Sequence, residues 1–599
     1  MDKPSAEFIF ACRLDELVVD GMRVVHGGPT PLLLVHDRGR VFALDNRCPH
    51  MGFPLHQGSV EDGILTCHWH HARFDLSSGC TFDLWADDVP RAEVDIRGDE
   101  IWVSATAARA GETGRWRRRL LDGMARNISL VMGKAILDAL DRGVSAREII
   151  REAALFGVKN RDGWDVGMTI LTALGNVIED LPERETYLAL FQGVRRVAAD
   201  CAGEPPYLSS GPLEDADIPE AQLEDWLRKW TRVRHRTGAQ RTVETALAAG
   251  MASARLTAMM AAAATDRAFA DGGHSLDFIN KALECLDLIG WDHAGGVVPT
   301  AVGHMVQARG SEESDSWRYP VDLVALVDET AERLPALFEQ GKAAVDFNNH
   351  ARLAEGLLSE TPEAVLDAIC SAVADGAAPV DLSRALAYAA ALRVARFGTA
   401  NEFSDWDSAH HVFTYCNALH QVLKRIAANG GGASPPDAVR GVLHGAMALY
   451  LRRYLNVPPA TLPGEEGRPL DGLPAAADDL LDQLLGSFDR QAQVDVSAQL
   501  VARYLGLGHD PGKLITALAF ALLREDAGFH TYQMFEAGVR QFREWGPSDE
   551  GRHILIAVTR FMAAHFPTER SRFQTADVAE RLHRGGALYE GEGEEPGSP

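Results

Sequence analysis

Two short segments decide the fold of the first hundred residues: Cys48-Pro49-His50, and sixteen residues later Cys67-His68-Trp69-His70. Each segment follows a predicted strand and precedes a predicted turn, so the two segments form two loops. One cysteine and one histidine from each loop provide two thiolates and two imidazoles. This ligand set suits a [2Fe–2S] centre with two histidines on one iron. A zinc site built from the same four residues is the alternative.

The neighbouring sequence predicts β-structure. Asp37 to Arg40 and Arg97 to Glu100 each separate two apolar runs, as in hairpins, and Ser77 to Gly79 forms a turn after a short strand. With the Cys/His spacing, residues 7–105 resemble the Rieske family.

The Rieske resemblance implies a role for each residue of the two loops. Cys48 and Cys67 would bind one iron through sulfur, and His50 and His70 would bind the other. His68 and His71 do not match ligand positions. High-potential members carry an additional cysteine in each loop, where this chain has Phe53 and Trp69. The resemblance therefore implies the lower-potential type found in oxygenases and their ferredoxins.

The composition excludes several classes of protein. The chain has 599 residues, a formal net charge of −26 and 46% hydrophobic residues, so it is folded rather than disordered and is too acidic to neutralise phosphates. Its eight cysteines are too few for a disulfide scaffold. No apolar run is long enough to span a bilayer and no leader pattern is visible, so we expect a cytoplasmic protein that binds neither membrane nor nucleic acid.

The chain is predicted to contain more than one domain, with an N-terminal all-β Rieske domain followed by a large, predominantly α-helical domain. Apolar residues recur every three and four positions after residue 118. We expect a Rieske domain over residues 1–105, a linker over 106–120, a helical domain with a second metal or substrate site over 121–585, and a disordered acidic tail over 586–599.

The helical part departs from ring-hydroxylating oxygenases, which bind iron through D/E-x-x-H-x-x-x-x-H. Asp407 and His410 begin such a pattern, but position 415 is tyrosine. Three segments, one of them this stretch, place polar residues on an apolar helix. They contain His274 with Lys281, His410 with the adjacent His411, and His530. For the first segment, a salt-bridged helix face is an equal alternative to a site.

These three segments resemble the questin-oxidase-like proteins, a helical family of oxygenases. The resemblance implies a mononuclear non-haem iron, with His274, His410 or His411, and His530 as ligands. A carboxylated lysine belongs to the site in some members, and Lys281 matches it. We expect burial to lower the pKa of Lys281 and free the neutral amine that carboxylation needs.

The sequence therefore predicts an oxidoreductase, an iron-dependent mono- or dioxygenase acting with O₂ on a small organic substrate of aromatic or polycyclic type. Its predicted cofactors are a [2Fe–2S] cluster and mononuclear Fe(II). No dinucleotide-binding motif is present, so electrons must come from a partner reductase or ferredoxin. Two alternatives remain open: an electron-transfer protein whose helical domain docks a partner without a second metal, and a redox sensor. A homo-oligomer in which one chain's cluster serves a neighbour's site is also open.

Overall fold

The structure is a computed structural model. It describes residues 7–107, 114–214, 217–342, 347–428, 435–465 and 470–589, without the side chains of residues 403, 435 and 436. The chain divides into two compact units, Met1–Ser145 with Gln574–Pro599, and Ala146–Phe573. These bounds differ from the expected ones, because the first unit also includes the two helices after the β domain and most of the last helix. Residues 108–113 of the expected linker and 590–599 of the expected tail lie outside the described residues.

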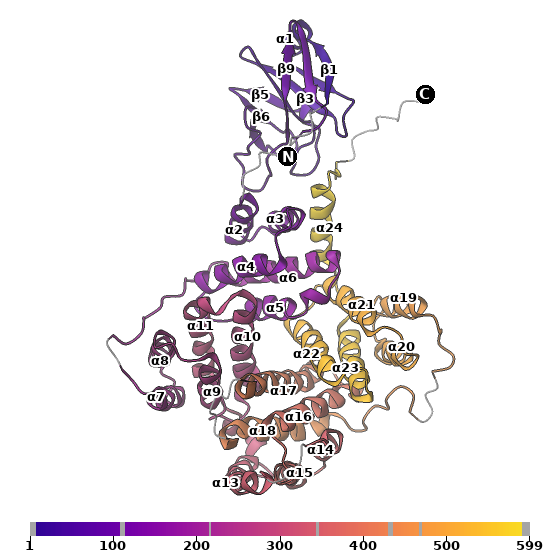
Figure 1. Cartoon of the computed structure of the whole chain (residues 1–599). Coiled ribbons are helices and arrows are strands. Elements are labelled where there is room, and N and C mark those ends of the chain that lie inside the picture. The colour runs from indigo at the N-terminus through magenta and orange to yellow at the C-terminus, as the bar shows by residue number, and fades with distance from the viewer. Residues whose placement is uncertain are drawn as a thin grey trace. The chain divides into compact units, whose positions relative to one another are not determined.

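The first unit is built on three antiparallel sheets, ordered β1-β10-β9, β2-β3-β4-β8 and β5-β6-β7 (Figure 1). Its strands are β1 Phe8–Arg13, β2 Met22–Val25, β3 Leu32–Asp37, β4 Arg40–Asp45, β5 Ser59–Glu61, β6 Ile64–Thr66, β7 Arg73–Asp75, β8 Arg91–Ala92, β9 Val94–Arg97 and β10 Glu100–Ser104. Its helices are α1 Leu14–Asp20, α2 Arg115–Ala125, α3 Ser129–Asp141 and most of α24 Ser571–His583.

The alternation of side chains along β3 explains why this strand is apolar on both faces. Leu33 and Val35 pack into the core that also contains the two predicted cluster cysteines, whereas Leu32 and Leu34 pack into a second core on the other face. The predicted hairpin at Asp37–Arg40 is confirmed, because these two residues pair across the turn between β3 and β4. The predicted hairpin between β9 and β10 is confirmed in the same way.

The second unit is helical, as predicted. Its helices are α4 Ala146–Asn160, α5 Val166–Gly175, α6 Glu183–Cys201, α7 Glu220–Arg232, α8 Arg236–Ala248, α9 Ser253–Ala264, α10 His274–Ile289, α11 Ala294–Gln307, α12 Asp315–Arg318, α13 Leu323–Gly341, α14 His350–Leu357, α15 Pro362–Ala374, α16 Pro379–Ala395, α17 Phe403–Ala428, α18 Pro435–Leu451, α19 Ala477–Ser487, α20 Val494–Gly506, α21 Pro511–Leu523, α22 Phe529–Trp545 and α23 Asp549–His565. No described helix is both long and apolar enough to cross a membrane.

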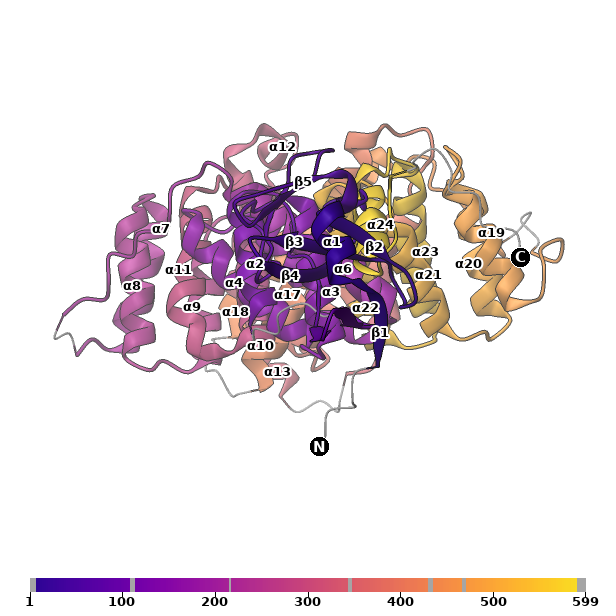
Figure 2. The ribbon, with the colours of Figure 1, turned by 90° about the horizontal axis from the view of Figure 1, so that it is seen from above.

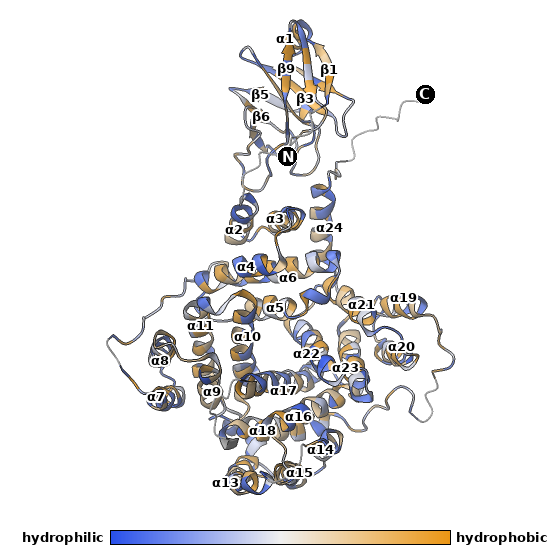
Figure 3. Ribbon diagram, viewed as in Figure 1, coloured by the Kyte–Doolittle hydropathy of each residue, from blue (hydrophilic) through white to orange (hydrophobic). Residues whose placement is uncertain are grey.

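Helix α17 lies at the centre of the helical unit and contacts α9, α10, α16, α18 and α22. At the edge of the unit, α19 and α20 pack beside α21 and α23, as Figures 1 and 2 show. Much of α17 is coloured hydrophilic in Figure 3, although most of its residues are buried. A buried helix with polar side chains needs internal partners for them. The interior around α17 is therefore where a polar site can form.

Candidate metal centres

The two Cys/His loops of the first unit fold in the same way. The Gly52 N–H donates to the Cys48 carbonyl oxygen at 2.7 Å, and the His71 N–H donates to the Cys67 carbonyl oxygen at 2.9 Å. Both donors have a left-handed backbone, with φ of 84° at Gly52 and 62° at His71. His71 therefore has a backbone role as a turn residue, and its side chain is exposed.

The four predicted ligands converge between these loops. The Cys48 and Cys67 side chains are buried and hydrogen-bonded to each other, and the His50 and His70 rings have centroids 4.8 Å apart. The shared hydrogen bond raises the pKa of Cys48 and lowers the pKa of Cys67 to about 6. Burial, together with His70, lowers the pKa of His50 to about 4, which favours the neutral form that binds metal.

The residues at this site fit a [2Fe–2S] cluster. His50 Nδ1 is buried and has no hydrogen-bond partner among the described residues, so its lone pair is available to a metal. Backbone N–H groups of His50 and Met51 contact the Cys48 sulfur, and those of Trp69 and His70 contact the Cys67 sulfur. Such hydrogen bonds stabilise thiolate charge and tune a cluster's potential.

Lys134 on α3, which is absent from the predicted site, contacts the first loop. Its ammonium donates to the Pro49 carbonyl oxygen at 2.6 Å and pairs with Asp87 at 3.2 Å, while Trp85 packs on the His50 ring with centroids 4.6 Å apart. The chain has eight lysines, and Lys134 lies inside an apolar helix. The pattern that singled out Lys281 could therefore have found Lys134.

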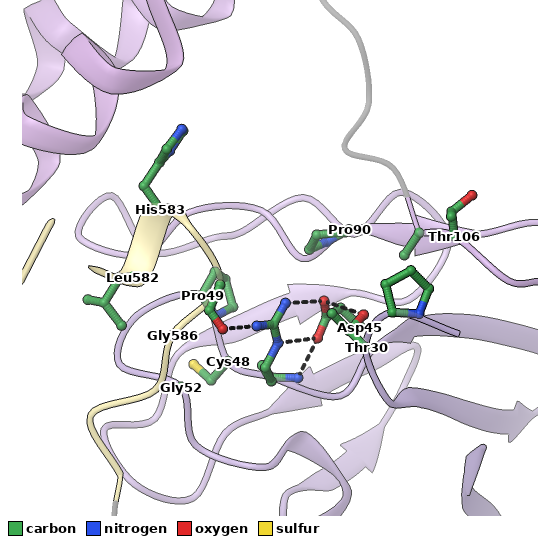
Figure 4. Close-up of a pocket in the computed structure, with 14 residues that line it drawn as sticks. Thr30, Asp45, Cys48, Pro49, Gly52, Pro90, Thr106, Leu582, His583 and Gly586 are labelled. Atoms are coloured by element: carbon green, nitrogen blue, oxygen red, sulfur yellow. Dashed lines mark hydrogen bonds and ion pairs between the residues drawn. The ribbon is translucent and has the colours of Figure 1, made fainter. Parts of the chain in front are cut away.

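The segment after α24 lies against the same loops. The Leu588 N–H donates to the Met51 carbonyl oxygen at 3.2 Å, and the Tyr589 ring contacts the rings of Phe53 and Trp69, with centroids 5.0 and 5.3 Å away. Figure 4 shows the neighbouring pocket, with Asp45 and Cys48 among the residues that line it. The pocket has a volume of about 270 Å³, and Arg47, which also lines it, donates to the Asp45 carboxylate at 2.9 Å. The described end of the expected tail is thus part of the cluster surroundings.

A second group of possible ligands lies inside the helical unit. One ring nitrogen each from His274 on α10, His411 on α17 and His530 on α22 lie within 4.8 Å of one another. His411 Nε2 and His530 Nε2 are 3.0 Å apart. Two imidazole nitrogens bound at about 2.1 Å to one metal, at right angles, would be separated by about 3.0 Å. We call these three residues the histidine triad.

Asp407 sets the orientation of His530. Its carboxylate lies 3.1 Å from His530 Nδ1, so Nδ1–H donates to it and the Nε2 lone pair faces His411. Burial opposes ionisation of Asp407, but hydrogen bonds from His530 and His565 outweigh it and lower the pKa of Asp407. A carboxylate bonded to the outer nitrogen of a histidine is the usual support for a metal ligand.

The electrostatics favour the neutral imidazole at two members of the triad, His274 and His411. Burial, reinforced by His530, lowers the pKa of His274 to about 4. Burial, reinforced by His274, lowers the pKa of His411 to about 3. Histidines bind metals in the neutral form, so these rings can take a cation at neutral pH without first losing a proton.

The chain enters α10 through a strained backbone. Phe269, Asp271, Gly272 and Gly273 have φ of 42°, 50°, 62° and 100°. A β-carbon on Gly273 would lie 2.9 Å from the Tyr415 β-carbon, so glycine is required there both for its φ and for the close approach to α17. Strain of this kind concentrates at functional sites, and here it immediately precedes His274.

His410 lies behind the triad rather than in it. It is fully buried, its ring centroid is 5.0 Å from that of His530, and neither of its ring nitrogens has a hydrogen-bond partner in the part of the chain that the structure describes. Burial holds the pKa of His410 well below its ordinary value. The structure thus brings three of the predicted histidines together, and the ligand role of each stays a prediction.

The expected low pKa of Lys281 is wrong. Its ammonium donates to Glu284 Oε2 and Glu536 Oε2, each at 2.8 Å. Burial alone would lower the pKa of Lys281, but the two carboxylates outweigh it and raise that pKa. Lys281 is two turns from His274, about 10 Å along α10. The neutral amine needed for carboxylation is therefore disfavoured, because Glu284 on the same helix and Glu536 from a distant part of the sequence both stabilise the ammonium.

Fold and ligand set together define an iron–sulfur protein, and comparisons with known proteins identify its family. Residues 7–88 match the Rieske [2Fe-2S] domain. The chain is 36% identical over 100 residues to the 3-phenylpropionate/cinnamic acid dioxygenase ferredoxin subunit of Photorhabdus laumondii, covering 94% of that protein and 16% of this chain. It is 31% identical over 93 residues to the ferredoxin component of biphenyl 2,3-dioxygenase from Rhodococcus jostii, covering 87% of it and 15% of this chain.

The chain therefore belongs to the Rieske [2Fe–2S] domain family, and the domain implies a [2Fe–2S] cluster. It is also 35% identical over 96 residues to human apoptosis-inducing factor 3, where the match spans 16% of that relative and 16% of this chain. The resemblance of the helical unit to questin-oxidase-like proteins stays a prediction.

Proposed function

We propose that this protein is a Rieske-dependent oxygenase whose histidine triad holds a mononuclear iron. The observation that carries the proposal is the convergence of His274, His411 and His530 from three helices, with the two Nε2 atoms of His411 and His530 3.0 Å apart. The cluster would supply single electrons, and an iron with open coordination positions would supply O₂ activation. The ferredoxin relatives from dioxygenase systems support this pairing.

Residues around the triad would orient one of its histidines and give the site an apolar flank. Asp407 keeps the proton of His530 on Nδ1 and so leaves Nε2 free to bind. Phe278 and Phe529 lie beside the His274 ring, with centroids 5.5 and 5.6 Å away, and give the triad an apolar flank. An apolar flank suits a small organic substrate, and the biphenyl and cinnamic acid systems of the relatives suggest an aromatic one.

We further propose that electrons reach the cluster from a separate reductase or ferredoxin.

The second candidate function is that of an electron-transfer protein without a second metal, and it is favoured by the two relatives that are themselves ferredoxin components. The two functions differ in how much iron each chain binds.

Iron and acid-labile sulfide analysis of anaerobically purified protein separates the two functions. The oxygenase should hold about three irons and about two sulfides per chain, and the electron-transfer protein about two of each. In the Cys48→Ser variant, the cluster signal should disappear while a mononuclear iron signal remains. Adding His530→Ala should remove that remaining signal, whereas adding His293→Ala, at a partly exposed histidine of the same unit, should not. Loss of all iron with Cys48→Ser alone would refute the oxygenase proposal.

A further inference from the structure

A ladder of buried polar side chains runs away from the histidine triad between α10 and α22. The His274 and His530 rings are stacked with centroids 5.9 Å apart and planes 5° apart. One turn further, the Gln533 amide donates to the Asp277 carboxylate. The following rungs join Lys281 to Glu536 at 2.8 Å and Arg540 to Glu284 at 2.5 Å. We call the last three rungs the α10–α22 ladder: Asp277, Lys281 and Glu284 with Gln533, Glu536 and Arg540.

The far end of the ladder opens to solvent. Glu284 and Arg540 line a cavity of about 420 Å³, and Arg540 is partly exposed. Asn176 at the end of α5 donates to Glu284 and to Glu536, both at 2.8 Å, and closes the network around them. The ladder therefore extends along the two helices from the turn after the triad to a solvent-accessible cavity.

Asp277 is the member of the ladder that an ion-pair network does not explain. It is 2% exposed, and its carboxylate accepts from a neutral amide, while Lys281 on the next turn pairs with Glu284 and Glu536 instead. The charged groups that face Asp277 are Lys281, Glu536 and Glu284. Burial raises the pKa of Asp277 to about 7, with Lys281 opposing the shift and the two glutamates adding to it. This carboxyl group can therefore hold a proton near neutral pH.

Stability alone gives little reason for such a ladder. Buried ion pairs are often replaceable by apolar residues without loss of stability, because the desolvation cost offsets the attraction. The Gln533 Oε1 atom is buried without a hydrogen-bond partner in the described ranges, so the rung nearest the triad has room for a further donor. A protonated Asp277 or a water molecule would satisfy this acceptor.

We propose that the α10–α22 ladder delivers protons from the solvent cavity to the histidine triad, with Asp277 as the proton donor nearest the triad. The inference rests on the proposed oxygenase function, because insertion of one oxygen atom into a substrate consumes two protons: RH + O₂ + 2 e⁻ + 2 H⁺ → ROH + H₂O. The electrons come from the cluster's reductase. Asp277 gives up its carboxyl proton toward the oxygen that is reduced at the triad. It recovers a proton from solvent through the Glu284 and Glu536 rungs.

The test begins with the protonation state of Asp277 in the full-length protein. Infrared spectra at neutral pH should contain a protonated carboxyl band that shifts in D₂O and is lost in Asp277→Asn. The control Glu244→Gln removes a buried carboxylate on α8, outside the ladder, and should leave the band in place. Persistence of the band in Asp277→Asn would overturn the inference, whatever the iron content.

The second measurement follows reoxidation of the reduced cluster by O₂, at equal iron content. Asp277→Asn should slow reoxidation about 100-fold and increase the peroxide released per O₂ consumed. Glu536→Gln, which interrupts refilling, should slow the later turnovers more than the first. If the wild type binds a third iron and Asp277→Asn reoxidises normally, the ladder inference is wrong and the oxygenase proposal stands. If the wild type binds no third iron, both fail.

Discussion

Replacing Lys281 with methionine tests whether the ladder is a tightly coupled ionic network. The ammonium is 1% exposed and lies 2.8 Å from both Glu284 and Glu536. Removing one partner from a buried ion pair typically costs about 3–5 kcal/mol. The pKa of Glu284 agrees in direction: burial opposes ionisation, but Arg540 and then Lys281 outweigh it and lower that pKa to about 2.

The pH dependence of this loss of stability follows from the directions in which the pKa values are shifted. Because the pKa of Glu284 is lowered, its stabilisation is present above about pH 4.5 and is lost as pH falls toward 2. Because the pKa of Lys281 is raised, its stabilisation is present below its ordinary value of 10.5 and is lost only at higher pH. The difference between wild type and Lys281→Met should therefore shrink in acid, where Glu284 is protonated. It should widen above about pH 7, because Lys281 holds down the pKa of Asp277 and the variant keeps Asp277 protonated to higher pH.

Hydrogen exchange of peptides from α10 and α22 measures this loss as the free energy of opening these helices. The matched control is Lys424→Met. Lys424 pairs with Glu544, but its side chain is 42% exposed, so we expect a loss of about 0–1 kcal/mol. Adding Glu536→Gln to Lys281→Met should recover part of the loss, since it removes an uncompensated carboxylate. A cost for Lys281→Met no larger than that of Lys424→Met would refute the reasoning.

Three further predictions concern the two candidate metal centres. Asp407→Asn should weaken Fe(II) binding at the triad about 10–100-fold, because His530 loses the carboxylate that fixes its tautomer; chelator competition measures this, and unchanged affinity would contradict it. Gly273→Ala should lower the free energy of opening α10 by about 1–3 kcal/mol in hydrogen exchange, because its φ is 100° and its β-carbon would meet Tyr415. Lys134→Met should lower the reduction potential of the cluster, measured by potentiometric titration, because a cation beside the first loop is lost; a higher potential would contradict the assignment.

The sequence was sufficient for the hairpins and the two Cys/His loops of the first unit, because their determinants are local. The hairpin at Asp37–Arg40 needs only the apolar runs on either side of it, and the predicted cluster ligands lie within one short stretch of chain. The boundaries of the unit could not be predicted in the same way. Helix α24 joins this unit from the other end of the chain, and its own pattern does not identify the surface against which it packs.

The histidine pair on α17 shows where helical periodicity stops being informative. His410 and His411 point about 100° apart, so one sequence pattern admits either as a ligand. The choice depends on where α10 and α22 contact α17, since His274 and His530 meet His411 there. The raised pKa of Lys281 has a local and a distant cause: Glu284 lies one turn along α10, whereas Glu536 lies 255 residues away. Local pattern alone therefore does not determine these chemical properties.

The distribution of buried polar groups ties the triad and the ladder together. Helices α5 and α21 are also buried, and their buried residues are almost all apolar or hydroxyl-bearing. On α10 and α22, by contrast, consecutive turns carry imidazole, carboxyl, amide and ammonium groups on the two faces that meet. Each such group loses solvation on folding and must be offset by a partner, so a ladder of this length is a poor way to hold two helices together. Its position on the same two helices as His274 and His530 is better explained by chemistry that moves charge toward the triad.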